Sequence, residues 1–324
     1  MGILELLNTR HQAELKELNY HISKQLENDN SLMSKVVSTH LRTKGKQLRP
    51  LLVLVCAKMF APLTQKAYAA AAAVELLHNA SLIHDDVVDN SPTRRGNPTI
   101  NAVWDNHIAV LVGDFFTSSA MKEALSTGDI RIVDSLCSLG RTLSLGEIDQ
   151  IHNAREHHLS EDNYYKVIDY KTASLFVSSA EMGCLASGVD DHRKDALSKY
   201  ALLFGRCFQI RDDIFDYYSS ELVGKPTGND LREGKISLPL LYALRKSDAP
   251  NHAEILAMVE QDGLSDQQIE IIQDFARKNG GIDYSFAVME DLRTKAMQEL
   301  DKLPDCTEVR ELRELFDFVI TRKY

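Results

Sequence analysis

Turn-forming residues, clustered cysteines and long apolar runs are all scarce in this sequence. Its 324 residues include only 8 prolines and 16 glycines, below the usual roughly 5% and 7%, which is a poor match for a fold of many short strands. The 5 cysteines are odd in number and no two are close, so we expect buried free thiols rather than a disulfide framework or a cysteine-rich zinc site. Apolar runs fall short of the ~18 residues of a membrane span, and the N-terminal residues lack a signal-peptide pattern. These absences predict a soluble, cytoplasmic protein without a membrane span.

Basic charge is also in deficit. With 37 Lys and Arg against 47 Asp and Glu, the net charge is −10, which argues against a nucleic-acid partner bound by a broad basic face. Hydrophobic residues make up 44% of the chain and charged residues 26%, as in globular proteins generally, so wholesale disorder is excluded.

Apolar residues recur at helical spacing through almost the entire chain, and no pair of alternating strands is joined by a hairpin turn. Helical windows are predicted at residues 3–28, 51–60, 66–88, 105–125, 129–152, 161–187, 193–218 and from 236 to the end. Ser160 and Ser265 are predicted N-caps. Loop character is concentrated at 89–100 and 219–235, which are rich in charged and turn residues. We therefore predict one all-α domain over residues 1–324 with two functional loops.

An acidic motif, HDDVVD at 84–89, follows the apolar helical stretch ELLHNASLI. On a helix, Asp85 and Asp89 share one face, and like charges at that spacing destabilise a helix by about 0.2–0.5 kcal/mol. A divalent cation would offset this repulsion, because Mg²⁺ commonly binds one or two carboxylates together with substrate phosphate. Taken alone, the motif fits a solvated acidic helix end equally well.

The same pattern recurs as RDDIFD at 211–216, again after an apolar helical stretch, 201–210. The first aspartates of the two copies, Asp85 and Asp212, are 127 residues apart (212 − 85). Two copies in the same helical setting disfavour the solvated-end interpretation. If the two helices face each other, their carboxylates line one cavity, which predicts a multi-metal site for a polyanion such as diphosphate. The six aspartates are Asp85, Asp86, Asp89, Asp212, Asp213 and Asp216.

Basic residues accompany both acidic motifs, although the chain as a whole is acidic. They are Lys46, Arg49, Arg94, Arg95, Lys225 and Lys235. Arginine offers phosphate a planar fork of donors, whereas lysine is a mobile point charge. Their placement fits recognition of a diphosphate, although any one of them alone would be ordinary surface charge.

Two segments resemble other known motifs but do not match them. GNDLREGK at 228–235 has five residues between Gly228 and Gly234, and Ile236 follows the lysine where a Walker A loop requires Ser or Thr. The dipeptide HD at 84–85 also occurs in metal phosphohydrolases, but no histidine cluster accompanies it.

A series of segments along the chain carries a resemblance to one family. In order they are GKQLRP (45–50), ELLHNASLIHDDVVD (75–89), RRGNPT (94–99), GD (113–114), GEIDQ (146–150), YKTASLF (170–176), FQIRDDIFD (208–216) and GKPTGNDLREGKISLP (224–239). In number, order and spacing they resemble the trans-isoprenyl diphosphate synthases, the polyprenyl synthetase family, and within it the long-chain, octaprenyl-type enzymes. The resemblance implies an all-α isoprenoid synthase bundle around a deep central cavity, and a homodimer.

The resemblance also implies a role for each matching residue. The metal ligands are Asp85, Asp89 and Asp212, with Asp86, Asp213 and Asp216 binding Mg²⁺ directly or through water, and three Mg²⁺ ions are implied per active site with diphosphate bound. The residues that match the isopentenyl diphosphate site are Lys46, Arg49, His78 and Arg95. Those that match the allylic diphosphate site are Arg94, Lys171, Thr172, Gln209, Lys225 and Lys235. Arg94, Lys171 and the six aspartates form the implied catalytic set.

Two positions depart from the family pattern. Gln47 stands where GK(R/K)xRP has a basic residue, which removes one charge beside the isopentenyl site. Ser237 replaces the usual threonine of the TLP segment and keeps the hydroxyl group.

The implied reaction is a Mg²⁺-dependent prenyl transfer. Metal ions and basic residues would neutralise the diphosphate of an allylic substrate such as farnesyl diphosphate, whose C–O bond then ionises. The double bond of isopentenyl diphosphate attacks the resulting cation head-to-tail, and a proton is lost to the departing diphosphate. Repetition gives an all-trans-polyprenyl diphosphate, which we expect to supply a quinone side chain.

Product length is predicted from the residues that precede the first motif. Ala80 and Ser81 are small, where short-chain members of the family commonly carry large aromatic residues. With Leu77 and the alanines further down, they predict an apolar channel of about 24 Å from Asp85 to Ala69, at 1.5 Å per helical residue. We therefore expect a product longer than C20. The alternative is that residues 69–73 form a closely packed helix pair.

Several other functions share part of this pattern. Within the class, a geranylgeranyl or farnesyl diphosphate synthase is the alternative. A non-catalytic subunit of a heteromeric synthase is disfavoured because both acidic motifs are complete. A class I terpene cyclase would not need Lys46, Arg49 and His78. A metal phosphohydrolase would release phosphate without forming a carbon–carbon bond.

Overall fold

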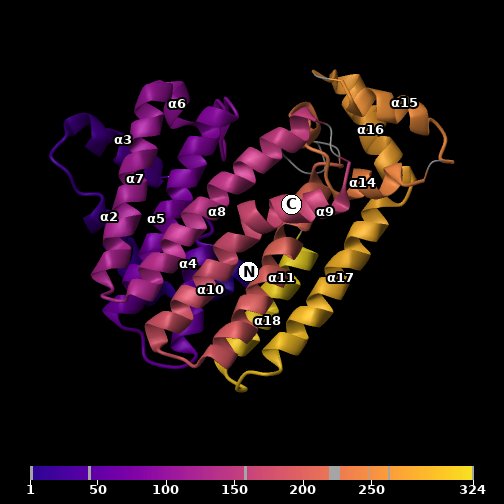
Figure 1. The fold of residues 1–324 in the computed structure, drawn as a ribbon. Coiled ribbons are helices and arrows are strands. Elements are labelled where there is room, and N and C mark those ends of the chain that lie inside the picture. The colour runs from indigo at the N-terminus through magenta and orange to yellow at the C-terminus, as the bar shows by residue number, and fades with distance from the viewer. Residues whose placement is uncertain are drawn as a thin grey trace. The chain divides into compact units, whose positions relative to one another are not determined.

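The structure is a computed structural model that describes residues 3–42, 45–156, 159–218, 227–246, 248–261 and 263–322. Helices make up most of these residues, as the spacing of apolar residues predicts (Figure 1). The helices are α1 Ile3–Arg10, α2 Gln12–Gln25, α3 Ser31–Arg42, α4 Leu48–Lys58, α5 Gln65–Val88, α6 Ile100–Val103, α7 Asn106–Ser126, α8 Ile130–Arg155, α9 Glu161–Ile168, α10 Ser174–Ser187, α11 Asp191–Phe215, α13 Asn229–Arg232, α14 Leu238–Leu244, α15 His252–Val259, α16 Asp266–Lys278, α17 Gly281–Leu300 and α18 Thr307–Thr321. A π-helical turn, η1 Asp169–Ala173, separates α9 from α10, and the strands are β1 Thr93–Arg94 and β2 Asn97–Pro98. The predicted all-α fold class is confirmed.

Both predicted loops contain short elements. In 89–100, β1 and β2 pair antiparallel through Arg95 and Gly96, whose φ angles of 54° and 76° fit a type I′ turn. The sequence predicts no hairpin because these strands are only two residues long and lack apolar alternation. In 219–235, helix α13 occupies Asn229–Arg232, whereas 219–226 lie outside the described residues.

The chain divides into two compact units. The first comprises Met1–Arg141, Leu175–Ser198 and Leu303–Glu311, and the second comprises Thr142–Ser174, Lys199–Lys302 and Leu312–Tyr324. Each unit is therefore built from three separate segments of the chain. Some of the boundaries fall inside helices, among them α8 and α11. The single domain over 1–324 stays a prediction.

Helix α5 forms the core of the first unit and lies along α7. Its alanines 69–73 are only 0–2% exposed. Alanine combines the highest helix propensity with a side chain small enough for two helices to approach closely. A channel wide enough for water would leave part of these side chains accessible, so this tract is a close-packed helix contact. Of the two interpretations of residues 69–73, the structure therefore supports the closely packed helix pair and not the lining of an apolar channel.

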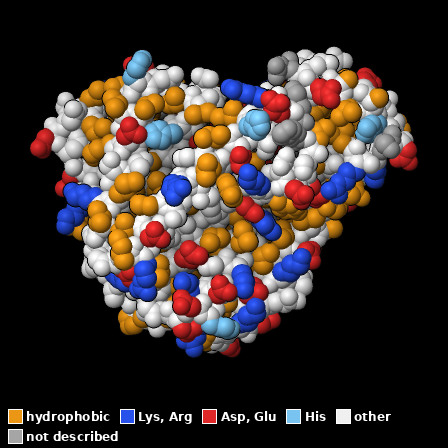
Figure 2. Space-filling view, in the orientation of Figure 1, with side chains coloured by type: hydrophobic (Ala, Val, Ile, Leu, Met, Phe, Trp, Pro, Cys, Tyr) orange, Lys and Arg blue, Asp and Glu red, His pale blue; other side chains and the backbone are white. Residues whose placement is uncertain are grey.

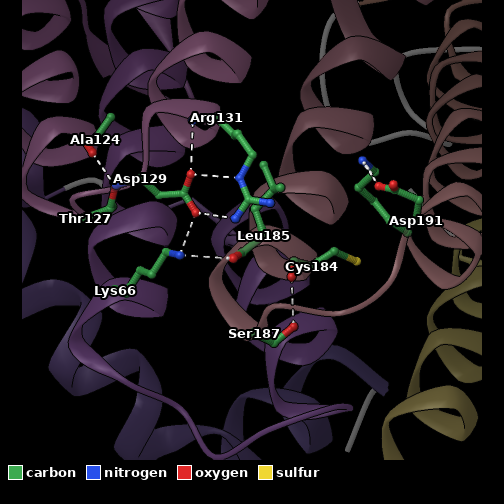
Figure 3. Close-up of polar contacts among 10 residues, drawn as sticks. Lys66, Ala124, Thr127, Asp129, Arg131, Cys184, Leu185, Ser187 and Asp191 are labelled. Atoms are coloured by element: carbon green, nitrogen blue, oxygen red, sulfur yellow. Dashed lines mark hydrogen bonds and ion pairs between the residues drawn. The ribbon is translucent and has the colours of Figure 1, made fainter.

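Asp129 joins three helices of the first unit (Figure 3). Its carboxylate accepts hydrogen bonds from Arg131 Nε at 2.9 Å, Arg131 Nη2 at 2.7 Å and Lys66 Nζ at 2.7 Å. Lys66 Nζ also donates to Leu185 O at 3.2 Å. Arg131 and Lys66 hold the pKa of Asp129 well below its usual range. The start of α5, the turn before α8 and the end of α10 are thereby tied together.

In the second unit, α14 packs on both α16 and α17. A Cβ atom at Gly281 would lie 2.1 Å from Pro239 O, so the approach of α17 to α14 requires glycine. Both predicted N-caps are confirmed. Ser160 Oγ accepts a backbone N–H of α9, and Ser265 forms a capping box with Gln268.

The cysteines carry free thiols, as predicted, but they are not all buried. Cys56, Cys184 and Cys207 lie in the core, whereas Cys137 is exposed and Cys306 is partly exposed. The prediction fails at Cys137 because it occupies an outward position of the amphipathic helix α8. Across the described ranges, no helix combines the length and the apolar character needed to cross a membrane.

Candidate active site

The first acidic motif occupies the end of α5 in the first unit. Asp86 is buried and accepts a hydrogen bond from Arg94 Nε at 2.7 Å. Burial raises the pKa of Asp86, and the Arg94 guanidinium opposes that shift. Asp85 and Asp89, one helical turn apart, are partly exposed. The motif therefore combines one inward aspartate, fixed by an arginine from the β1–β2 hairpin, with two outer ones.

All four residues predicted at the isopentenyl diphosphate site also belong to the first unit. Arg49 Nη1 donates to His78 Nε2 at 3.2 Å, and the Arg49 guanidinium carbon lies 4.8 Å from the centroid of the Phe176 ring. The Arg95 guanidinium packs on Gly45, where a Cβ atom would lie 2.7 Å from Arg95 Nη1. Glycine at position 45 therefore makes room for one arginine, and the aromatic ring supports the other.

His78 is neutral in these surroundings. Burial lowers the pKa of His78 well below its usual value, and the charges of Arg49, Arg95 and Arg94 lower it further. Because Arg49 donates to Nε2, we assign the ring proton to Nδ1. That buried nitrogen has no hydrogen-bond partner in the part of the chain that the structure describes. The cluster thus offers concentrated positive charge and an unsatisfied donor, as an anion site requires.

The remaining residues of the GKQLRP segment lie at the entry to α4. Lys46 is exposed, and Gln47 has a φ of 49°. Gln47 Nε2 donates to Asn19 Oδ1 at 3.2 Å. Gln47, one of the two residues that depart from the family pattern, therefore ties the start of α4 to α2.

The second acidic motif lies at the end of α11 in the second unit and also has a buried member. Asp213 accepts hydrogen bonds from Tyr164 OH at 2.6 Å and from Gln209 Nε2 at 2.8 Å. Burial raises the pKa of Asp213 to about 7, although both hydrogen bonds lower it. Asp212 is partly exposed and accepts a hydrogen bond from Arg322 Nη2 at 2.5 Å.

Asp216 connects the end of α11 to the start of α13. Its carboxylate accepts backbone N–H groups from Gly228 at 2.8 Å and from Asn229 and Asp230 at 3.2 Å each. Asp216 therefore holds the start of α13 against the end of α11. Its contact with a metal ion, direct or through water, stays a prediction.

Lys171 and Thr172, predicted at the allylic diphosphate site, both lie on η1. Lys171 Nζ is 2.5 Å from Glu147 Oε2 and donates to Gln150 Oε1 at 3.2 Å. Thr172 Oγ1 donates to Gln209 Oε1 at 2.7 Å. Gln209 thus links Thr172 to the buried aspartate of the second motif.

Two further predicted contacts to the allylic diphosphate lie after α11. Lys235 forms an ion pair with Glu233. Lys225 lies outside the described residues.

The residues predicted to set product length differ in accessibility. Ala80 and Leu77 are buried. Ser81 is partly exposed, and its hydroxyl donates to His78 O at 2.9 Å. Ser81 is therefore the position of the three with the most room for a larger side chain.

Sequence reasoning missed the side chains that hold the aspartates and lysines in place. Glu147 could have been found from the sequence, since it lies in the matching segment GEIDQ. Tyr164 carries no motif and resembles any core tyrosine on an amphipathic helix. Arg322 has no local signal either, because its partner Asp212 is 110 residues away in the sequence.

The donor set fits a hard divalent cation. Asp85, Asp89 and Asp212 present carboxylate oxygens from partly exposed positions. Mg²⁺ in proteins binds such oxygens together with water and substrate phosphate. Among the residues with described positions, no three acidic, histidine or cysteine side chains converge closely enough to hold an ion by themselves. The carboxylates therefore suit Mg²⁺ by the type of atom that they offer, together with ligands from water and substrate.

Comparison with known proteins identifies the family. A family model described as Polyprenyl synthetase matches residues 30–275. The chain belongs to the polyprenyl synthetase family. Among its curated relatives, the octaprenyl diphosphate synthase of Haemophilus influenzae is 32% identical over 312 residues, which cover 96% of this chain and 94% of that one. The resemblance to octaprenyl-type enzymes is confirmed.

Solved structures of this family share the fold. A decaprenyl diphosphate synthase from Rhodobacter capsulatus aligns with a TM-score of 0.93 at 31% identity, over 99% of both chains. A polyprenyl synthase from Caulobacter crescentus, complexed with calcium and isoprenyl diphosphate, aligns with a TM-score of 0.90 at 31% identity, over 99% of this chain and 98% of that one. A geranylgeranyl pyrophosphate synthase from Bacteroides thetaiotaomicron aligns with a TM-score of 0.85 at 36% identity, over 99% of both chains. These likenesses confirm the isoprenoid synthase fold.

Proposed function

We propose that this chain is a Mg²⁺-dependent trans-prenyltransferase. It condenses isopentenyl diphosphate repeatedly with an allylic diphosphate, farnesyl diphosphate, to give an all-trans-polyprenyl diphosphate longer than C20. The observation that carries the proposal is the division within each acidic motif. A buried, hydrogen-bonded aspartate, Asp86 or Asp213, stands beside partly exposed ones that suit a metal ion. Family membership and the named activities of the relatives support the reaction class.

Two groups of residues serve the two diphosphates. The cluster of Arg49, Arg95 and neutral His78 binds the diphosphate of isopentenyl diphosphate, and the unsatisfied Nδ1–H of His78 is a donor suited to it. Lys171 and Thr172 on η1 bind the allylic diphosphate, with the carboxylates of Asp85, Asp89 and Asp212 holding Mg²⁺. The isopentenyl diphosphate site distinguishes the proposal from a terpene cyclase, which needs no such site.

The chemistry follows from charge neutralisation. When bound, Mg²⁺ neutralises the diphosphate as a leaving group. Lys171 and Arg94 add positive charge and hydrogen-bond donors to the same group. The allylic C1–O bond breaks heterolytically, and its electron pair leaves with diphosphate. The C3–C4 π electrons of isopentenyl diphosphate then form the new bond from C4 to allylic C1. The C2 proton passes to the released diphosphate, so no protein base is required.

The proposed product length is supported by a small residue at the accessible position. Ser81 is partly exposed on α5 just before the first motif, and a serine there leaves room for a growing chain. The decaprenyl and octaprenyl relatives agree with a long product. A C20 product is the second candidate, favoured by the 36% identity to the geranylgeranyl pyrophosphate synthase.

We also propose that two copies associate through α7. Apolar side chains repeat on its outer surface, with Leu111 60% and Leu125 62% exposed, and Ile130 at the start of α8 is 74% exposed. Figure 2 shows hydrophobic side chains gathered over α6 and α7. A second copy would remove these side chains from water. The cytoplasmic location and the count of three Mg²⁺ ions stay predictions.

A product assay tests the proposal. The full chain is incubated with Mg²⁺, labelled isopentenyl diphosphate and farnesyl diphosphate, and the dephosphorylated products are separated by length. We expect labelled prenols beyond C20, loss of product when the metal is chelated, and recovery when Mg²⁺ is restored. Asp85→Asn should abolish turnover, whereas Asp283→Asn, an exposed carboxylate of α17, should not.

Two other outcomes would decide between the alternatives. A C20 product would keep the chemistry and replace the long-chain proposal with the second candidate. No labelled prenol with any allylic primer would contradict the enzyme assignment and favour a non-catalytic subunit.

A further inference from the structure

The helix that contains Lys171 changes its hydrogen-bond pattern at η1. The N–H of Ser174 donates to Asp169 O, five residues back, which is the π-helical pattern. Ser174 Oγ donates to Tyr170 O at 2.6 Å and satisfies a carbonyl inside the turn. π-helical turns are rare, and they are frequently found at functional sites. This one carries both Lys171 and Thr172.

Helix α11 holds the turn from one side through an arginine. Arg206 Nε and Nη2 donate to Asp169 Oδ1 and Oδ2, each at 2.6 Å, in a bidentate pair. The Arg206 guanidinium carbon also lies 5.4 Å from the centroid of the Tyr165 ring. Gln209, one turn further along α11, accepts the hydrogen bond of Thr172. The same helix therefore fixes the first residue of the turn and one of its predicted substrate ligands.

Helix α8 holds the turn from another side. A Cβ atom at Gly146 would lie 2.8 Å from Tyr170 Cβ and 3.2 Å from Lys171 N. Glycine therefore allows α8 to pass directly over the turn. The following residue, Glu147, meets the Lys171 ammonium group.

We propose that Arg206 is a positioning residue for the allylic diphosphate, because its bidentate pair with Asp169 maintains the π-helical turn that directs Lys171 and Thr172. The inference rests on the proposed function. A regular α-helix turns about 100° per residue. If the turn became regular α-helix, Lys171 and Thr172 would rotate about the helix axis by that amount and lose their contacts with Glu147 and Gln209.

Kinetic constants for the two substrates test this role. Arg206→Ala should lower kcat/KM for the allylic diphosphate by about 10²-fold, the effect of misplacing a ligand by about 1 Å. The KM of the allylic substrate should carry most of the loss, and the KM of isopentenyl diphosphate should not change. Arg206→Lys keeps the charge without the bidentate geometry and should lose nearly as much.

A matched control is available in the same unit. Arg293 Nε donates to Asp317 Oδ1 at 2.6 Å and joins α17 to α18. Arg293→Ala should change the thermal midpoint about as much as Arg206→Ala does, but should leave both KM values unchanged. A purely structural role for Arg206 would make the two variants alike in kinetics.

Chemical rescue gives a second readout. Arg206 and Tyr165 line a pocket of about 760 Å³ with Leu241, Leu244 and Tyr284. Guanidinium ions from solution can therefore reach the space that Arg206→Ala creates. Millimolar guanidinium chloride should restore the allylic KM of Arg206→Ala, whereas equal concentrations of urea or sodium chloride should not.

The outcomes separate this inference from the proposed function. If the wild-type chain makes no prenol, the proposed function fails. If the wild type is active but Arg206→Ala keeps the wild-type allylic KM, the positioning role is overturned. If Arg206→Ala does not fold, Arg206→Lys decides, and an unchanged allylic KM in that variant overturns the role.

Discussion

Asp213→Asn should make the protein more stable above neutral pH. The carboxyl group of Asp213 is buried at the end of α11, where Tyr164 and Gln209 donate to it. Burial raises its pKa from about 3.8 to about 7. The protonated form is therefore favoured by folding, and the stability it gives is complete below pH 3.8 and is lost as pH rises through 7. Above pH 7 the folded protein carries a buried anion that the asparagine variant lacks.

The size of the effect follows from the pKa. A rise of about 3 units corresponds to about 4 kcal/mol at 1.36 kcal/mol per unit. Between pH 5 and pH 8, the wild type should lose about 3 kcal/mol of unfolding free energy relative to Asp213→Asn. The asparagine oxygen can keep the hydrogen bond from Gln209 Nε2 while its NH₂ group donates to the Tyr164 hydroxyl. Any loss of hydrogen-bond strength in this exchange costs the variant up to about 1–3 kcal/mol. That cost does not depend on pH, so it cancels when the two pH values are compared.

Urea unfolding of both proteins from pH 5 to pH 8.5, with chelator present to exclude metal ions, measures this difference. Tyr164→Phe is the companion variant. It removes a donor to the charged carboxylate, so it should enlarge the pH dependence. Parallel pH profiles for the wild type and Asp213→Asn would refute the argument that burial holds this carboxyl group partly neutral.

Three further predictions concern packing, product length and assembly. Gly281→Ala should lower the unfolding free energy by about 1–3 kcal/mol or more, since its Cβ would overlap the backbone of α14; Gly140→Ala, with open space around it in α8, should raise the same quantity by about 1 kcal/mol. Ser81→Phe should give shorter prenol products, as measured by chromatography, at little cost in stability. Ala80→Phe, at a site only 1% exposed, should instead lower the thermal midpoint. Unchanged products in Ser81→Phe would show that the product channel does not run along this face of α5. If two copies associate through α7 as proposed, Leu111→Lys should sediment as a monomer, and a profile like that of a dimeric wild type would place the interface elsewhere.

Local patterns determined most of the secondary structure and pointed to the candidate site residues. Helical spacing of apolar residues placed the main helices, and Ser160 and Ser265 marked two of their starts, because caps depend on residues only three positions apart. The repeated aspartate motifs were enough to predict a site for a divalent metal ion from side-chain chemistry alone. The ordered segments around them were sufficient to identify the family.

Tertiary structure decided which side chains hold each of those groups. The two aspartate motifs look alike in sequence, yet Asp86 is fixed by an arginine and Asp213 by a tyrosine and a glutamine. The alanine tract could have lined a channel, and only the packing of α5 on α7 showed that it does not. The first residue of the π-helical turn, Asp169, is held by Arg206, which is 37 residues away. Burial and pairing between distant residues depend on which surfaces meet, so no local pattern in the sequence carries them.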